Sequence, residues 1–203
     1  MPDFFIFADI IGIIAFSISG FLIAIKNDLD ILGIVIASGL TALGGGIIRD
    51  AILSSTPFAF TSLYPALTLL GTILIAYIFK LYKKPSIERK WMFVVSDTIG
   101  LVAFSITGAI LAIHAEYNFF GIIILSFITA VGGGVTRDIM INQVPTVLIS
   151  DFYGSIAVIV ALSLATLEAL NSLNEVTLST VAVCSIILRL IAFKRGWNLP
   201  RLN

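Results

Sequence analysis

TALGGGIIRD, residues 41–50, is the stretch that decides how this chain folds. Three consecutive glycines lie inside an apolar run, and an arginine–aspartate pair follows them. Each glycine destabilises a helix by about 1 kcal/mol relative to alanine, so the triplet predicts a break in the helix. A charged pair inside a membrane-spanning segment indicates a functional site, because charge is costly there.

The composition is that of an integral membrane protein. Hydrophobic residues make up 59% of the chain and charged residues 12%, whereas soluble proteins carry about 25% charged residues. The 12 basic and 12 acidic residues balance, which gives no support for a nucleic-acid partner. With one cysteine, Cys184, and one histidine, His114, the sequence offers neither an internal disulfide nor a multi-histidine metal site. We therefore expect no cofactor and no resident metal.

The apolar segments predict an all-α polytopic protein, because a helix of ~20 apolar residues crosses a bilayer. We read residues 1–203 as a single transmembrane domain with seven spans at 4–25, 31–55, 58–80, 91–113, 119–142, 146–168 and 175–193. Lysine and arginine gather after the third span and at the C-terminal end, and such loops stay cytoplasmic. The sequence thus predicts a protein of the cell inner (plasma) membrane with its N-terminus outside and its C-terminus in the cytoplasm.

The motif of residues 41–50 occurs twice, since residues 129–138 read TAVGGGVTRD. A shift of 88 residues aligns residues 9–57 with 97–145 without a gap, which indicates a duplication. The repeats cover about 4–80 and 91–168, and each has three spans. Because three is odd, the second repeat enters the membrane from the opposite side, as in transporters built from inverted repeats. The seventh span, 175–193, has no copy.

The helical rise of 1.5 Å per residue groups the charged residues into two layers, one on each side of the membrane centre. One layer contains Asp9, Arg49 and Asp50, and the other contains Asp97, Arg137 and Asp138. An unpaired charge in hydrocarbon costs at least a few kcal/mol, so we predict the pairs Asp9–Arg49 and Asp97–Arg137. A purely structural role, closing the gap beside a broken helix, is the alternative.

Between the layers, the sequence predicts a narrow polar path made of hydroxyl groups and of carbonyls freed where the second and fifth spans break. The predicted lining is Ser17, Ser19, Thr41, Gly44, Gly45, Gly46, Ser105, Thr107, Thr129, Gly132, Gly133 and Gly134. Two alternatives stay open. Glycines in membrane helices also serve close packing, and serine or threonine often bonds a preceding carbonyl of its own helix.

The doubled motifs, the seven spans and the short loops resemble the prokaryotic members of the trimeric intracellular cation (TRIC) channel family, or its sister group of small bacterial membrane proteins that carries a glycine-transporter label. The resemblance implies a homotrimer in the lipid bilayer, with a pore for monovalent cations in each subunit. It also implies kinks at residues 44–46 and 132–134. Animal members carry a phosphoinositide-binding Lys-Glu-Val motif in a kinked span, where this chain has its glycine motifs instead.

Two functions follow from these patterns. The first is a passive channel for potassium, and also sodium, because the path is made of hydroxyls and carbonyls. The alternative is a facilitator for glycine or another small zwitterion, because an arginine–aspartate couple can hold a carboxylate and an ammonium. We do not expect an enzyme, since the sequence contains no arrangement of paired carboxylates, activated nucleophile or metal ligands.

Overall fold

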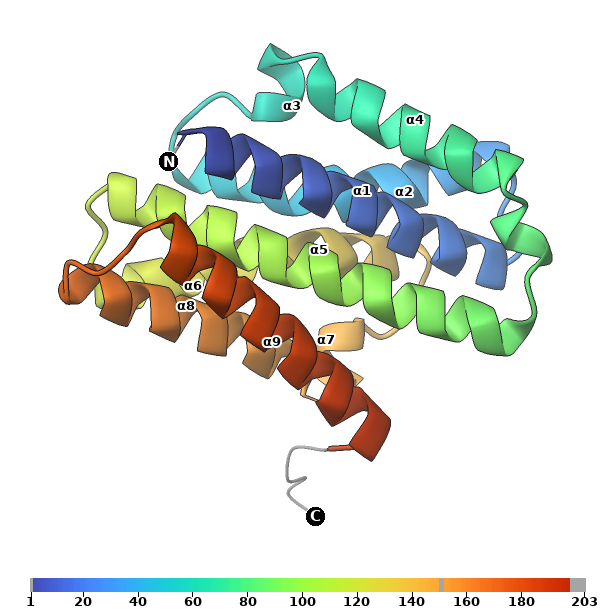
Figure 1. Ribbon diagram of the computed structural model, residues 1–203. Helices are drawn as coiled ribbons and strands as arrows, with labels where there is room; N and C mark the ends of the chain where they lie inside the picture. The colour runs from blue at the N-terminus through green and yellow to red at the C-terminus, as the bar shows by residue number, and fades with distance from the viewer. Residues whose placement is uncertain (1, 150–151, 198–203) are drawn as a thin grey trace.

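The computed structural model describes residues 2–149 and 152–197, and these form an all-helical bundle (Figure 1). The elements are α1 (Pro2–Lys26), α2 (Ile31–Ile52), α3 (Phe58–Thr61), α4 (Tyr64–Ile78), the 3₁₀ turn η1 (Leu81–Lys83), α5 (Ser86–His114), α6 (Phe119–Met140), α7 (Thr146–Ile149), α8 (Tyr153–Ala169) and α9 (Glu175–Arg195). Helices α1, α2, α5 and α6 form the centre of the bundle, and α4, α8 and α9 flank it.

Five helices are long and apolar enough to cross a membrane: α1, α2, α5, α6 and α9. The third and sixth predicted spans differ from the expectation, because each consists of a four-residue helix followed by a longer one. In the third span, Ser62 is extended and Pro65 lies in the first turn of α4, where proline suits the start of a helix. In the sixth span, residues 150 and 151 lie outside the described residues. The resulting helices α4 and α8 have 15 and 17 residues.

The duplicated sequence builds the same local structure twice. Asp30 accepts a hydrogen bond from the Gly33 amide at the start of α2, and Asn118 accepts one from the Gly121 amide at the start of α6. These side chains satisfy amide groups that a helix leaves without partners in its first turn. Figure 1 shows the matching helices α1 and α5, and α2 and α6, running in opposite directions.

The two halves interlock through aromatic rings and glycines where α1 crosses α5. The rings of Phe16 and Phe104 have centroids 5.3 Å apart. Phe16 packs against Gly100, and Phe104 packs against Gly12. All four positions are related by the shift of 88 residues. Each ring therefore fills the space that the missing side chain leaves in the opposite repeat.

Both glycine triplets lie inside continuous helices, in contrast to the predicted break. Helix α2 runs unbroken from Ile31 to Ile52, and α6 from Phe119 to Met140. The triplets bring the two helices into backbone contact. A side-chain carbon at Gly45 would overlap the carbonyl oxygen of Thr129, and one at Gly133 would overlap that of Thr41. Close packing, the role glycine commonly has between membrane helices, explains the triplets without loss of the helical hydrogen bonds.

Candidate ion path

The predicted path hydroxyls are all fully buried: Ser17, Ser19, Thr41, Ser105, Thr107 and Thr129. Three of them donate to the carbonyl four residues earlier, each at 2.6 Å: Ser17 to Ile13, Thr41 to Ala37 and Thr129 to Leu125. Their oxygens remain able to accept a further hydrogen bond or a cation. The hydroxyl of Ser105 is different, because no hydrogen-bond partner for it lies among the described residues.

Arg49 is the centre of the first charged layer, and 1% of its surface is exposed. Its Nε donates to Asp50 Oδ1 at 2.8 Å, and its Nη1 lies 3.9 Å from Asp9 Oδ1. The same Nη1 donates to the Thr107 hydroxyl at 3.4 Å, across to the second repeat. The predicted Asp9–Arg49 pair is therefore present. Tyr64, which we did not predict, donates to Asp9 Oδ2 at 2.9 Å.

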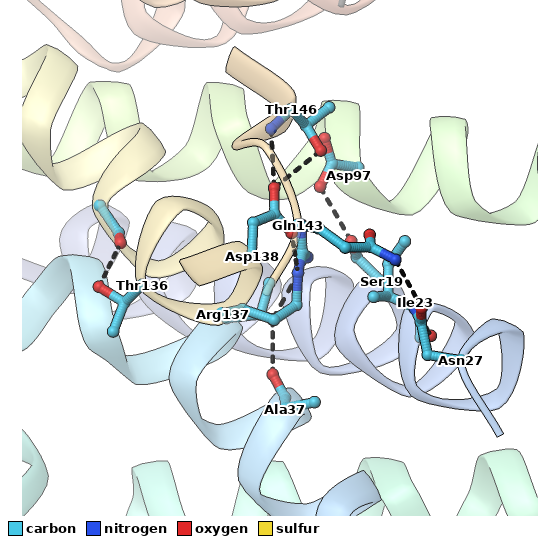
Figure 2. A network of polar contacts seen from close by, with 12 residues as sticks. Ser19, Ile23, Asn27, Ala37, Asp97, Thr136, Arg137, Asp138, Gln143 and Thr146 are labelled. Atoms are coloured by element: carbon cyan, nitrogen blue, oxygen red, sulfur yellow. Dashed lines mark hydrogen bonds and ion pairs between the residues drawn. The ribbon is translucent and has the colours of Figure 1, made fainter. Parts of the chain in front are cut away.

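Arg137 organises the second layer in a similar way (Figure 2). Its Nη2 lies 2.7 Å from Asp138 Oδ1, and its Nη1 donates to the Thr41 hydroxyl of the first repeat at 3.4 Å. The predicted Asp97–Arg137 pair is not among the ion pairs of the described residues. Asp97 instead accepts hydrogen bonds from Ser19, at 2.9 Å, and from Tyr153. Arg137 lies close enough to Asp97 for their opposite charges to attract each other, although the two side chains are not in direct contact.

The aspartate that follows each arginine, Asp50 or Asp138, also accepts hydrogen bonds from the next short helix. Asp50 Oδ2 accepts from the Phe58 amide at 2.9 Å, and Asp138 Oδ2 accepts from the Thr146 amide at 2.7 Å and the Thr146 hydroxyl at 2.9 Å. Figure 2 shows Asp138 between Arg137 and Thr146. One carboxylate thus holds the arginine with one oxygen and the start of the next short helix with the other. The Arg-Asp sequence therefore joins the end of α2 to α3, and the end of α6 to α7.

Three functional candidates were absent from our prediction: Tyr64, Tyr153 and Arg189. Tyr64 and Tyr153 begin α4 and α8 and bind the two membrane-embedded aspartates. They lie beyond the gapless repeat alignment, and they are separated by 89 residues rather than 88. Arg189 on α9 is 4% exposed, and its guanidinium carbon lies 5.3 Å from the centroid of the Tyr153 ring. Its positive charge attracts the negative charge of Asp97. Its position inside the last predicted span was the available signal.

A cavity of about 480 Å³ lies between α1, α5 and α9 and reaches the second charged layer. It is lined by Asp97, Thr146 and Arg189, and by basic residues at its mouth, Lys26, Arg89 and Lys90. We call this end of the bundle the basic end. Among residues 2–149 and 152–197, no three acidic, histidine or cysteine side chains come together as metal ligands.

Comparison with known proteins agrees with this architecture. A family model described as Glycine transporter matches residues 6–80 and 94–169, which are the two repeats. The chain belongs to this family. It is 32% identical over 193 residues to the UPF0126 inner membrane protein YadS of Escherichia coli K12, covering 95% of this chain and 93% of that one. It is 33% identical over 193 residues to the UPF0126 membrane protein YvgT of Bacillus subtilis 168, covering 94% and 93%.

Solved structures extend the family likeness to TRIC channels. A prokaryotic TRIC channel crystallised in 0.5 M KCl matches with a TM-score of 0.89 and 30% identity, over 98% of this chain and 100% of that chain. A chain from a study of conductance through TRIC cation channels matches with a TM-score of 0.84 and 36% identity, over 97% and 96%. The resemblance to prokaryotic TRIC channels is thus confirmed, and this family member is an all-helical, multi-pass membrane protein.

Proposed function

We propose that the protein is a channel through which monovalent cations, mainly potassium, cross the membrane passively. The observation that carries this proposal is the buried column of charges and hydroxyls that joins the two repeats, in which Arg49 reaches Thr107 and Arg137 reaches Thr41. A guanidinium group in hydrocarbon costs several kcal/mol unless it faces polar partners or water. Packing alone does not require two of them. The likeness to TRIC cation channels supports the same function.

The proposed path follows the contacts of α1 with α5 and of α2 with α6. Its lining is the predicted set of hydroxyls and glycines: Ser17, Ser19, Thr41, Ser105, Thr107, Thr129, Gly44–Gly46 and Gly132–Gly134. Asp9 Oδ1 and Ser105 Oγ are buried without a hydrogen-bond partner among the described residues, which supports them as positions for water or a cation. Because the lining hydroxyls are fully buried, conduction requires a more open arrangement.

Cation selectivity would arise from the first charged layer, which combines Asp9 and Asp50 with Arg49 and so carries a net negative charge when all three are ionised. Potassium would be held by the hydroxyl oxygens of the lining, which donate to carbonyls of their own helices and can still accept a cation.

We further propose that the repeats are inverted in the membrane, that the basic end faces the cytoplasm, and that three subunits assemble with one pore each. The opposite directions of matching helices support the inversion (Figure 1). The lysines and arginines around the cavity mouth support the orientation, since such residues favour the cytoplasmic side. The solved orthologue from Rhodobacter sphaeroides, described as trimeric, supports the trimer.

The test is a planar-bilayer recording of purified protein under potassium, sodium and glycine gradients. Wild-type protein should give single-channel currents that reverse near the potassium equilibrium potential. The Gly45→Ala, Gly133→Ala double variant should alter these currents because it changes the helix crossing, whereas Gly71→Ala, with nothing within 4 Å of the added carbon, should not. The absence of single-channel currents from well-folded wild-type protein would refute the channel proposal.

A second candidate is a facilitator for glycine or another small zwitterion. The observation in its favour is that one cavity is lined by both Arg189 and Asp97, which could hold a carboxylate and an ammonium. The family description points the same way. Saturable uptake of labelled glycine into proteoliposomes, lost in Arg137→Gln or Arg189→Gln, would support it. An ohmic cation leak that glycine does not change would count against it.

A further inference from the structure

The two buried arginines are covered differently, although the sequence around them is duplicated. The Arg49 guanidinium lies over two aromatic rings, 5.7 Å from the centroid of Phe5 and 5.4 Å from that of Phe58. Cations are attracted to the faces of such rings, most strongly where water is excluded. The Phe58 ring also packs directly on Gly46. The first layer is therefore closed from the end opposite the basic end by an aromatic cover, which we define as Phe5 and Phe58.

The second repeat lacks this cover. A shift of 88 residues places Phe93 and Thr146 at the equivalent positions. Both line the cavity of about 480 Å³ at the basic end instead of enclosing Arg137, and Figure 2 shows Thr146 close to Asp97. At Gly134, the counterpart of Gly46, only the Arg137 guanidinium lies within 4 Å of an added side-chain carbon, at 3.8 Å. The position of the Phe58 ring in the first repeat is thus taken in the second repeat by the smaller side chain of Thr146, which lines the cavity.

We propose that the aromatic cover is the closed gate of the path, and that the basic end is already open as far as Asp97. This inference rests on the proposed ion path. The gate residue Phe58 is linked to the charged layer, because Asp50 binds the Arg49 side chain with one oxygen and the Phe58 amide with the other. A passing cation would repel the Arg49 guanidinium, and because Asp50 links that group to the Phe58 amide, the displacement would move the helix that carries the ring. An apolar cover of this kind also excludes water while it is shut.

The functional test exchanges the two positions. Phe58→Thr should raise the open fraction of the channel about tenfold, the size of effect expected when one desolvated cation–π contact is lost. Thr146→Phe should reduce the current by blocking the open end. Phe60→Thr is the matched control, since Phe60 lies on the same short helix but is 74% exposed. Equal currents from Phe58→Thr and Phe60→Thr would overturn the gate.

A second test does not depend on conduction. In a Cys184→Ser background, which removes the only native cysteine, Thr107→Cys and Thr146→Cys are exposed to a membrane-impermeant methanethiosulfonate in detergent. Cysteine at 146, in the cavity, should react rapidly, whereas cysteine at 107, beneath Arg49, should be protected. Adding Phe58→Thr should accelerate the reaction at 107 at least tenfold, and adding Phe60→Thr should not.

The outcomes separate the gate from the channel itself. If cysteine at 107 is protected and loses this protection with Phe58→Thr, the aromatic cover is supported. If the same proteins carry no current, the cation channel is rejected. Rapid reaction at 107 in protein that retains Phe58, or no reaction at 146, would overturn the gate whatever the currents show. Thermal unfolding of each variant identifies those that fail to fold, and Phe58→Leu then provides a second variant that keeps apolar volume but lacks a ring.

Discussion

Gly45 of α2 lies directly against the carbonyl oxygen of Thr129 in α6, so that the two backbones touch. Gly45→Ala must push the helices apart, and overpacking of this kind destabilises a protein by about 1–3 kcal/mol. Gly71→Ala on α4 is the control, because nothing lies within 4 Å of the added carbon and alanine favours a helix. Thermal unfolding in detergent should rank Gly45→Ala well below wild type and Gly71→Ala at or above it. Equal stabilities would refute the close crossing.

The buried ion pair predicts strong non-additivity. Arg49→Met leaves Asp9 without its cation inside the bundle, and breaking a buried pair in this way costs about 3–5 kcal/mol. Combining it with Asp9→Asn should recover part of that loss. Lys84→Met, which breaks the exposed Lys84–Glu88 pair at 3.6 Å, should cost less than about 1 kcal/mol. The yield of monodisperse protein and its unfolding midpoint are measured for Arg49→Met, Asp9→Asn, their combination and Lys84→Met. Purely additive losses would argue against an Asp9–Arg49 interaction.

The two tyrosines at the starts of α4 and α8 predict matched effects. Tyr64→Phe removes a hydrogen bond to Asp9, and Tyr153→Phe removes one to Asp97. Each should destabilise the protein by about 1.5–3 kcal/mol, the range for a hydrogen bond to a charged group. Tyr77→Phe, on the exposed end of α4, is the control. A double-mutant cycle of Tyr64→Phe with Asp9→Asn should show a smaller loss, about 0.5–1.5 kcal/mol, because the Asn oxygen can still accept but carries no charge.

The two oxygens of Asp138 predict a graded series. Thr146→Val removes the hydroxyl that donates to Asp138 but keeps the amide, so it should cost about 1 kcal/mol. Asp138→Ala also removes the Arg137 partner and leaves the guanidinium uncompensated, which should cost several times more. Hydrogen exchange of the residue 139–149 segment should increase in both variants. An unchanged exchange rate in Asp138→Ala would show that this carboxylate does not hold α7 in place.

Much of this architecture could be predicted from the sequence, because duplication and charge leave clear signals. The Asp9–Arg49 pair follows from the helical rise and from the cost of a lone charge in hydrocarbon. The start of α2 at Ile31 agrees with the predicted span. Long apolar helices such as α5 are equally visible, since a membrane span is defined mainly by its length and hydropathy.

The remaining features depend on tertiary contacts that a local pattern does not contain. Helix propensity describes an isolated helix, and it indicated a break at Gly45, where backbone contact with another helix instead stabilises a continuous one. Tyr64 and Tyr153 escaped detection because the copies differ by one residue before them. In the sequence, Phe58 is an ordinary apolar residue whose counterpart in the second repeat is Thr146. The position of its ring over Arg49 depends on how the chain folds.

The cross-repeat bonds of the arginines have a consequence for biosynthesis. Arg49 is synthesised 58 residues before Thr107, its partner in the other half. Arg137, in turn, needs Thr41 from the half already made. The first three predicted spans therefore leave the ribosome with a guanidinium that has only part of its final surroundings. The duplicated halves have become a single cooperative unit, whose assembly is complete only when the later half inserts beside the earlier one.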